Sequence, residues 1–136
     1  MKVINIFEDN HGLEIHRDHR GVIADVFFGV VINHVAKIDS LPGVIRGNHY
    51  HALSTQHILI TKGSLEYWYK NISEVGFGTA YETKVGDLIT TPPNEIHALQ
   101  ISNFGCEFLA FTSGLRGGSD YESDTYRVES IIKPKL

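Results

Sequence analysis

The chain has 136 residues, of which 42% are hydrophobic and 21% are charged, so it can build one core but not two ordinary domains. Its formal net charge of -4 offers no basic face for a phosphate backbone, and we expect no nucleic-acid partner. Cys106 is the only cysteine, which excludes an internal disulfide and a thiolate metal cluster. We therefore predict a single domain over residues 1–136 with one site.

The chain contains no segment that is typical of a membrane span or an export signal. Its most apolar stretch, residues 21–35, is interrupted by Asp25 and Asn33 and is shorter than the roughly 20 apolar residues of a spanning helix. Near the N-terminus, Glu8 and Asp9 stand where a secretory signal is apolar. We expect a soluble, cytoplasmic protein with no membrane partner.

Short runs rich in β-branched and aromatic residues recur along the chain and predict strands. In chain order, the runs are residues 3–7, 22–28, 30–35, 56–61, 65–69, 79–83, 88–91, 96–101 and 106–112. Turn signals such as Lys62-Gly63 separate the runs, and no window has a sustained helical period. After a polar segment, we expect a last strand or a short helix around residues 126–132. The pattern predicts an all-β sandwich or barrel.

The spacing of three histidines indicates a site. His49 and His51 are two residues apart, and in a strand this spacing places both imidazoles on one face, where they can bind one metal ion or one ligand together. His97 follows a proline-bounded turn, and a closed barrel can return it to the pair. Tyr67 and Tyr69 share one strand face and can present a phenol to the same interior.

These spacings resemble the two signature motifs of the cupin superfamily, whose members are jelly-roll β-barrels. The first motif is matched by Gly43, His49, His51, Gln56 and Gly63. The second motif is matched by Gly86, Pro92, Asn94 and His97. The resemblance implies a single all-β cupin jelly roll.

The same motifs imply a divalent metal ion, and two positions depart from the usual pattern. Gln56 stands where the superfamily usually has glutamate, and its neutral amide oxygen is a weaker ligand for a dication. Asn94 stands where glycine is usual, and asparagine tolerates a left-handed turn well. We expect Zn²⁺, with Fe, Ni or Mn as alternatives, and no organic cofactor. The expected ligands are His49, His51, Gln56 and His97.

Three shorter segments resemble cupins that act on nucleotide-linked keto sugars. Residues 46–51 resemble the Arg-Gly-x-His segment of dTDP-sugar 3,4-ketoisomerases, and residues 18–21 are similar to the Asp-x-Arg-Gly segment that opens such domains. Asp124-Thr125-Tyr126 resembles the closing segment of the cupin domain fused to capsular-polysaccharide reductases. The resemblance implies an epimerase or ketoisomerase of a nucleotide-linked 4-keto-6-deoxy sugar in cell-surface polysaccharide biosynthesis.

Such an enzyme removes a proton from the carbon beside a ketone, which requires a base with a pKa near the working pH, as histidine has. The predicted catalytic residues are His49, His51 and Tyr69, and the predicted substrate-binding residues are Arg20, Arg46 and Tyr67. Arginine suits a diphosphate because its planar donors engage two oxygens together. A histidine that binds a metal cannot also accept a proton, so His49 as base and His49 as metal ligand are alternatives.

Two other functions remain open at this point. The chain also fits a metal-dependent cupin enzyme of another kind, such as a dioxygenase, or a non-catalytic cupin that binds a sugar or another ligand, because one fold hosts many activities. In each case the partner is a small molecule. We further predict a homodimer, since a small open jelly roll leaves edge strands and aromatic surface that pairing covers.

Overall fold

Strands form nearly all of the regular structure in the computed structural model, which describes residues 1–114 and 122–136. In chain order they are β1 (Lys2–Asn5), β2 (Ile15–Asp18), β3 (Gly21–Ala24), β4 (His34–Ser40), β5 (Ile45–Tyr50), β6 (Thr55–Asn71), β7 (Thr79–Glu82), β8 (Asp87–Thr91), β9 (Glu95–Ser113) and β10 (Tyr126–Arg127). The all-β prediction is confirmed. Within the described part of the chain, no helix is long and apolar enough to cross a membrane.

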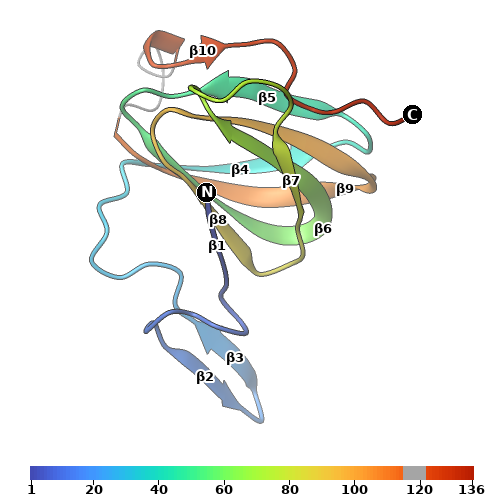
Figure 1. Cartoon of the computed structure of the whole chain (residues 1–136). Coiled ribbons are helices and arrows are strands. Elements are labelled where there is room, and N and C mark those ends of the chain that lie inside the picture. The colour runs from blue at the N-terminus through green and yellow to red at the C-terminus, as the bar shows by residue number, and fades with distance from the viewer. Residues whose placement is uncertain (115–121) are drawn as a thin grey trace.

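Two long strands, β6 and β9, organise the fold. They pair antiparallel from Thr55↔Ser113 to Asn71↔Glu95 and curve together around the body (Figure 1). The first half of β6 also pairs with β8, and its second half pairs with β7. In the same way, β9 pairs with β5 near its start and with β4 near its end. The long strands thus connect two half-sheets whose inner faces enclose the core, as in a jelly roll.

The predicted turn at Lys62-Gly63 is wrong, because the two predicted strands around it are one strand, β6. The register shifts twice here, between Ile60 and Lys62 and between Gly63 and Leu65. Gly63 has a φ of 74°, and an added Cβ would lie 2.2 Å from the carbonyl oxygen of Gly105. Glycine here permits a bulge that bends the strand without reversing it.

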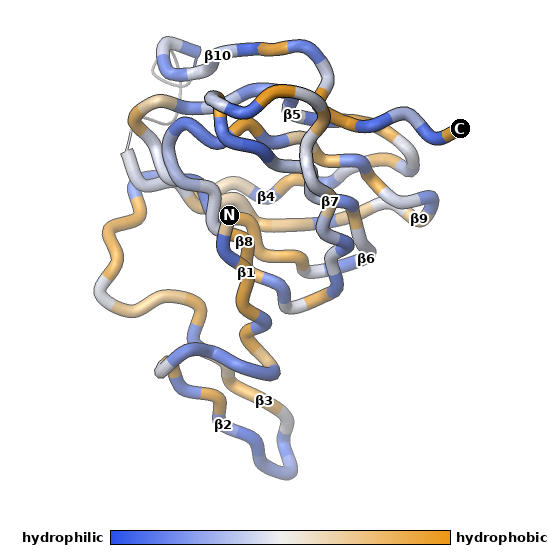
Figure 2. Tube along the Cα trace, viewed as in Figure 1, coloured by the Kyte–Doolittle hydropathy of each residue, from blue (hydrophilic) through white to orange (hydrophobic). Residues whose placement is uncertain are grey.

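The N-terminal part departs further from the prediction. Strands β2 and β3 form a separate hairpin that projects from the body, and only the start of the predicted run 22–28 forms a strand (Figure 1). Residues 25–33 then run outside the body before β4 begins at His34. Figure 2 shows hydrophobic residues along this outer segment. An apolar run alone therefore did not distinguish a strand from an extended surface segment.

Three apolar clusters cover the faces of the half-sheets. The inner cluster fills the body and includes Ile60, Tyr67, Ile89 and Phe108. A second cluster lies on the outer face of β6 and β8, where Phe27 and other residues of the N-terminal part pack. The third lies on the outer face of the other half-sheet and includes Ile96, Ala98, Trp68 and Ile131. The C-terminal tail covers this last face, and β10 extends it by pairing with β5.

Candidate functional site

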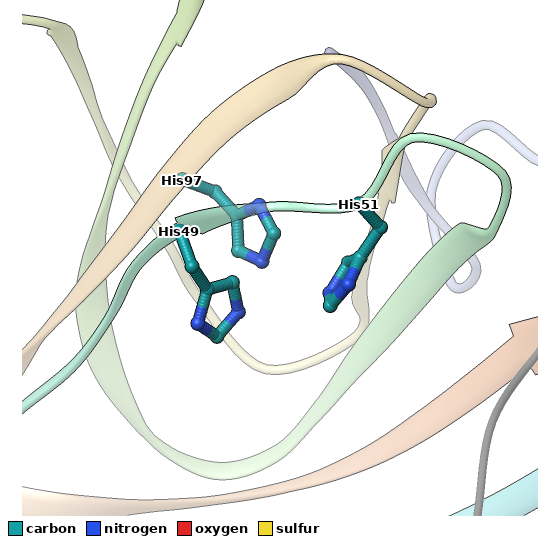
Figure 3. A group of neighbouring side chains, drawn as sticks. All are labelled: His49, His51 and His97. Carbon is teal, nitrogen blue, oxygen red and sulfur yellow. The ribbon is translucent and has the colours of Figure 1, made fainter. Parts of the chain in front are cut away.

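Three histidines converge inside the jelly roll (Figure 3). The ring centroids of His49 and His97 are 4.7 Å apart, those of His49 and His51 are 5.0 Å apart, and those of His51 and His97 are 5.5 Å apart. One nitrogen of each ring lies within 4.8 Å of the others. The structure therefore brings together the three histidines that the sequence singled out, from two strands and the loop that follows β5.

Strand pairing explains how His49 meets His97. The two residues are directly opposite each other in the β5–β9 register, after a bulge between Gly47 and His49. Gly47 has a φ of 87°, and an added Cβ would lie 2.7 Å from the carbonyl oxygen of His97. Only glycine allows β5 to approach β9 this closely and still adopt the left-handed conformation.

A hydrogen bond between two loops brings His51 to the same place. The Asn94 N–H donates to the carbonyl oxygen of His51 at 2.7 Å, which joins the turn before His97 to the end of β5. Asn94 has a φ of 66°, so the prediction that asparagine replaces glycine in a left-handed turn is confirmed.

The buried imidazole of His97 is suited to binding an electrophile. Its Nε2 is buried and has no hydrogen-bond partner among the described residues, while its Nδ1 lies 3.2 Å from the carbonyl oxygen of Glu95. Burial, together with the neighbouring His49, lowers the pKa of His97 to about 3, so the ring is neutral at pH 7. Neutral imidazoles at this separation are the donors that Zn²⁺ prefers, so His49, His51 and His97 could hold an ion.

The inward face of β6 carries three further predicted site residues, Gln56, Tyr67 and Tyr69. Gln56 shares this face with Ile58, because alternate strand residues point the same way. Tyr69 lies opposite His97, and the rings of Tyr67 and His97 stack with centroids 6.3 Å apart. His57, the neighbour of Gln56, points to the outer face, where its Nδ1 lies 2.8 Å from Thr90 Oγ1.

Tyr67 is part of the packed interior. Its side chain is fully buried, and its hydroxyl group hydrogen-bonds to Thr91 Oγ1 and lies 3.5 Å from Glu95 Oε1. Burial raises the pKa of the Tyr67 phenol far above its usual range, so the phenol is neutral. Sequence reasoning missed Thr91 and Glu95, which are buried polar residues within the second motif, just before Pro92 and just after Asn94.

The two predicted arginines lie in different places. Arg46 Nε donates to Ser40 Oγ at 2.7 Å, and its Nη2 donates to the carbonyl oxygen of Asp39 at 3.4 Å. It lies opposite Leu99, whose side chain is in the inner cluster. Arg20, by contrast, is on the projecting hairpin, where Nη2 pairs with Asp18 Oδ2 at 2.6 Å (Figure 1). Arg46 therefore lies on the same strand as His49, whereas Arg20 lies on the hairpin, apart from the histidines.

Comparison with known proteins supports the fold and gives a direction for the function. No protein-family model matches the sequence. A UDP-2-acetamido-2,6-beta-L-arabino-hexul-4-ose reductase of Pseudomonas aeruginosa is 26% identical over 122 residues, which are 86% of this chain and 32% of that protein. The chain therefore spans about a third of the length of this curated relative.

Solved structures with the same fold include two sugar-modifying enzymes. A variant of the 3,4-ketoisomerase QdtA from Thermoanaerobacterium thermosaccharolyticum superposes with a TM-score of 0.71 at 20% identity, over 93% of this chain and 86% of that chain. The dTDP-4-dehydrorhamnose 3,5-epimerase from Sulfolobus tokodaii superposes with a TM-score of 0.70 at 18% identity, over 90% of this chain and 77% of that chain. The predicted cupin jelly-roll fold is confirmed.

Proposed function

We propose that this protein is an epimerase or ketoisomerase of a nucleotide-linked 4-keto-6-deoxy sugar in cell-surface polysaccharide biosynthesis. The observation that carries the proposal is the convergence of His49, His51 and His97 inside the jelly roll. Two comparisons support it: QdtA has been solved with TDP and, as a variant, with TDP-4-keto-6-deoxyglucose, and the curated relative is a nucleotide-sugar reductase.

The reaction needs one proton transfer away from carbon and one back. His49 takes the proton from the carbon next to the ketone; the C–H electron pair forms a carbon–carbon double bond, and the carbonyl pair moves to oxygen. Proton return to the opposite face of the same carbon inverts it, which is epimerisation. For ketoisomerisation, the proton returns to the former carbonyl carbon, the hydroxyl group on the deprotonated carbon loses its O–H proton to become the new ketone, and the former carbonyl oxygen gains a proton to become a hydroxyl group. Tyr69, which lies opposite His97 on the neighbouring strand, is the proposed donor of the returning proton.

A divalent metal ion, with Zn²⁺ favoured, is the second part of the proposal. The residues fit it, because three imidazole nitrogens lie within 4.8 Å of one another and Gln56 shares the inward face. When bound, the ion would supply a Lewis acid that stabilises the developing oxygen anion. His49 can then no longer act as a base, so metal content at full activity distinguishes the two roles of His49.

Arg46 is the proposed ligand of the substrate diphosphate. Arg46 lies on β5, the strand that also carries His49, and its contacts with Ser40 and Asp39 hold the guanidinium at the end of β4. A planar guanidinium can engage two phosphate oxygens at once. Substrate binding by Tyr67 and Arg20 stays a prediction, as do the cytoplasmic location and the lack of an organic cofactor.

We also propose that the protein is a homodimer. Large apolar side chains are exposed on the hairpin and on the segment that follows it, including Ile23, Phe28 and Val31. Clustered apolar surface of this kind is typical of an interaction site. Strand β1, at one edge of the large sheet, offers a further surface for pairing.

Deuterium exchange tests the proposed activity. The protein, loaded with Zn²⁺ or stripped with a chelator, is incubated in D₂O with a panel of dTDP- and UDP-linked 4-keto-6-deoxy sugars, and NMR follows deuterium at the carbons beside the ketone. We expect incorporation with at least one substrate. If folded protein incorporates no deuterium in either state, the enzyme proposal fails; binding of the same sugars would then support a ligand-binding cupin.

A further inference from the structure

We propose that Asp124 is a positioning residue for His51: its carboxylate fastens the tail to the loop after β5, and its own carbonyl oxygen determines which nitrogen of His51 carries the proton. The inference deepens the proposed function, on whose histidine site it rests. It concerns the described residues on both sides of the contact, the loop at 52–54 and the tail from 122 onward.

The Asp124 carboxylate is buried and accepts hydrogen bonds from three consecutive backbone N–H groups. Oδ1 accepts from Ala52 at 3.0 Å and from Leu53 at 3.2 Å, and Oδ2 accepts from Leu53 at 3.2 Å and from Ser54 at 3.1 Å. The Ser54 hydroxyl also donates to Oδ2, at 3.0 Å. Consecutive N–H groups that converge in this way form a concave site for an anion, which here is filled by a side chain of the same protein.

These donors keep the buried carboxylate ionised. Asp124 is only 2% exposed, and burial by itself raises the pKa of a carboxyl group. The hydrogen bonds from the Ala52 N–H and the Ser54 hydroxyl outweigh burial and lower the pKa of Asp124 below its ordinary value. The contact is therefore a charge-assisted one that holds the tail at a defined position on the loop.

The position of the Asp124 backbone has a direct consequence for His51. His51 is 5% exposed, and its Nδ1 lies 2.9 Å from the carbonyl oxygen of Asp124. A carbonyl oxygen only accepts hydrogen bonds, so Nδ1 of the neutral ring must carry the proton, and the lone pair lies on Nε2. His97 is arranged alike, with its Nδ1 toward the Glu95 carbonyl oxygen. Two of the three histidines thus present Nε2 as their basic nitrogen.

Attachment of the tail does not depend on Asp124 alone. The Val128 N–H donates to the Asn48 carbonyl oxygen at 2.9 Å, and the Ile131 N–H donates to Asn48 Oδ1 at 3.0 Å. Ile131 is also buried in the outer cluster of the same half-sheet. Among these anchors, Asp124 is the one whose own carbonyl oxygen contacts a site histidine. Tail attachment and the protonation pattern of His51 can therefore be separated by mutation.

The test measures the tautomer of His51 in metal-free, ¹⁵N-labelled protein by long-range ¹H–¹⁵N correlation, with the His51 signals assigned from a His51→Asn spectrum. We expect one tautomer, protonated on Nδ1, in the unmodified protein and a mixture in Asp124→Ala, while His97 is unchanged. Asp124→Asn keeps an acceptor oxygen and should be intermediate. Zn²⁺ affinity, from competition with a chelating dye, should fall about 10- to 100-fold in Asp124→Ala.

Ile131→Ala is the matched control, because it weakens the tail without touching His51. It should keep the His51 tautomer and hold Zn²⁺ affinity within about twofold, well below the loss typical of a missing outer-sphere partner. If both variants disturb His51 equally, or if Asp124→Ala leaves tautomer and affinity unchanged, the inference is wrong. Should Asp124→Ala fail to fold, Asp124→Asn decides by the same readouts. The tautomer needs neither substrate nor metal, so its outcome is independent of the proposed activity.

Discussion

The histidine end and the hairpin end of the molecule depart in opposite ways from the usual distribution of polar and apolar residues between surface and interior. Around the histidines, polar side chains that are normally exposed are buried, among them His51, His97 and Asp124. On the N-terminal hairpin and the segment after it, apolar side chains are exposed: Ile23 by 66% and Phe28 by 84%. Each end therefore carries an arrangement that is unfavourable unless something else compensates for it.

The compensation comes from different sources. At the histidine end it lies within the chain, because backbone groups pair with the Asp124 carboxylate, through three N–H groups, and with Nδ1 of His51 and of His97, through carbonyl oxygens. At the hairpin end the described residues leave Phe28 largely uncovered. In the proposed homodimer, a second copy would cover the apolar end. Changes at the first end should affect chemistry and stability, and changes at the second should affect assembly.

The largest effect is expected from His49→Ala. Loss of a general base lowers kcat by about 100- to 10,000-fold, and deuterium exchange into the keto sugar measures it. His57→Ala is the matched control, since this buried histidine lies on the outer face of β6 and contacts Thr90. Equal losses in both variants would show that the effect arises from damage to the fold and not from the site.

The next effect is expected from Gly47→Ala, which combines a left-handed φ with a Cβ 2.7 Å from the His97 carbonyl oxygen. The backbone conformation alone costs about 1–3 kcal/mol. The close contact adds to this cost, because the His97 carbonyl oxygen belongs to the backbone and cannot rotate away as a side chain can. Gly43→Ala is the control: its φ is also positive, at 76°, but nothing lies within 4 Å of the added Cβ. Urea unfolding should show a greater loss for Gly47→Ala, and equal losses would refute the close-approach explanation.

The sequence patterns were sufficient to predict the histidine cluster but not the contacts that orient its rings. Strand alternation predicted that His49 and His51 share one face and that Tyr67 and Tyr69 share another, because a period of two is a local property of the chain, and the second motif added His97. The contact between His51 and Asp124 joins residues 73 positions apart through a backbone carbonyl oxygen, which no periodicity contains. Lys62-Gly63 was misinterpreted for a related reason: the same glycine suits a reversal or a bulge, and only the neighbouring Gly105 decides between them.

Acid should destabilise the histidine end. Burial lowers the pKa of His97 from 6.5 to about 3, so the folded state resists protonation of this ring. The stability that neutral His97 contributes is fully present above pH 6.5 and is lost as the pH falls toward 3. Within this window the free energy of unfolding falls by about 1.4 kcal/mol for each pH unit, so the loss reaches about 2 kcal/mol at pH 5. Urea unfolding of metal-free protein at several pH values measures the slope. His97→Asn should flatten it, and an unchanged slope would exclude His97 as the cause.

The smallest effect on the chain itself is expected from Phe28→Ser. Phe28 is 84% exposed, so its replacement should change the intrinsic stability of one chain by less than about 0.5 kcal/mol, as is usual for surface positions. If a second copy covers this segment, the unmodified protein should be dimeric in light scattering, with a Tm that rises with protein concentration. Phe28→Ser should then shift the population toward monomer and weaken that dependence on concentration. Phe104→Ser is the control, because Phe104 is also highly exposed, at 92%, but belongs to β9 and not to the hairpin or the segment after it. Its replacement should leave the dimer intact, and equal dissociation by both variants would contradict assembly through the hairpin end.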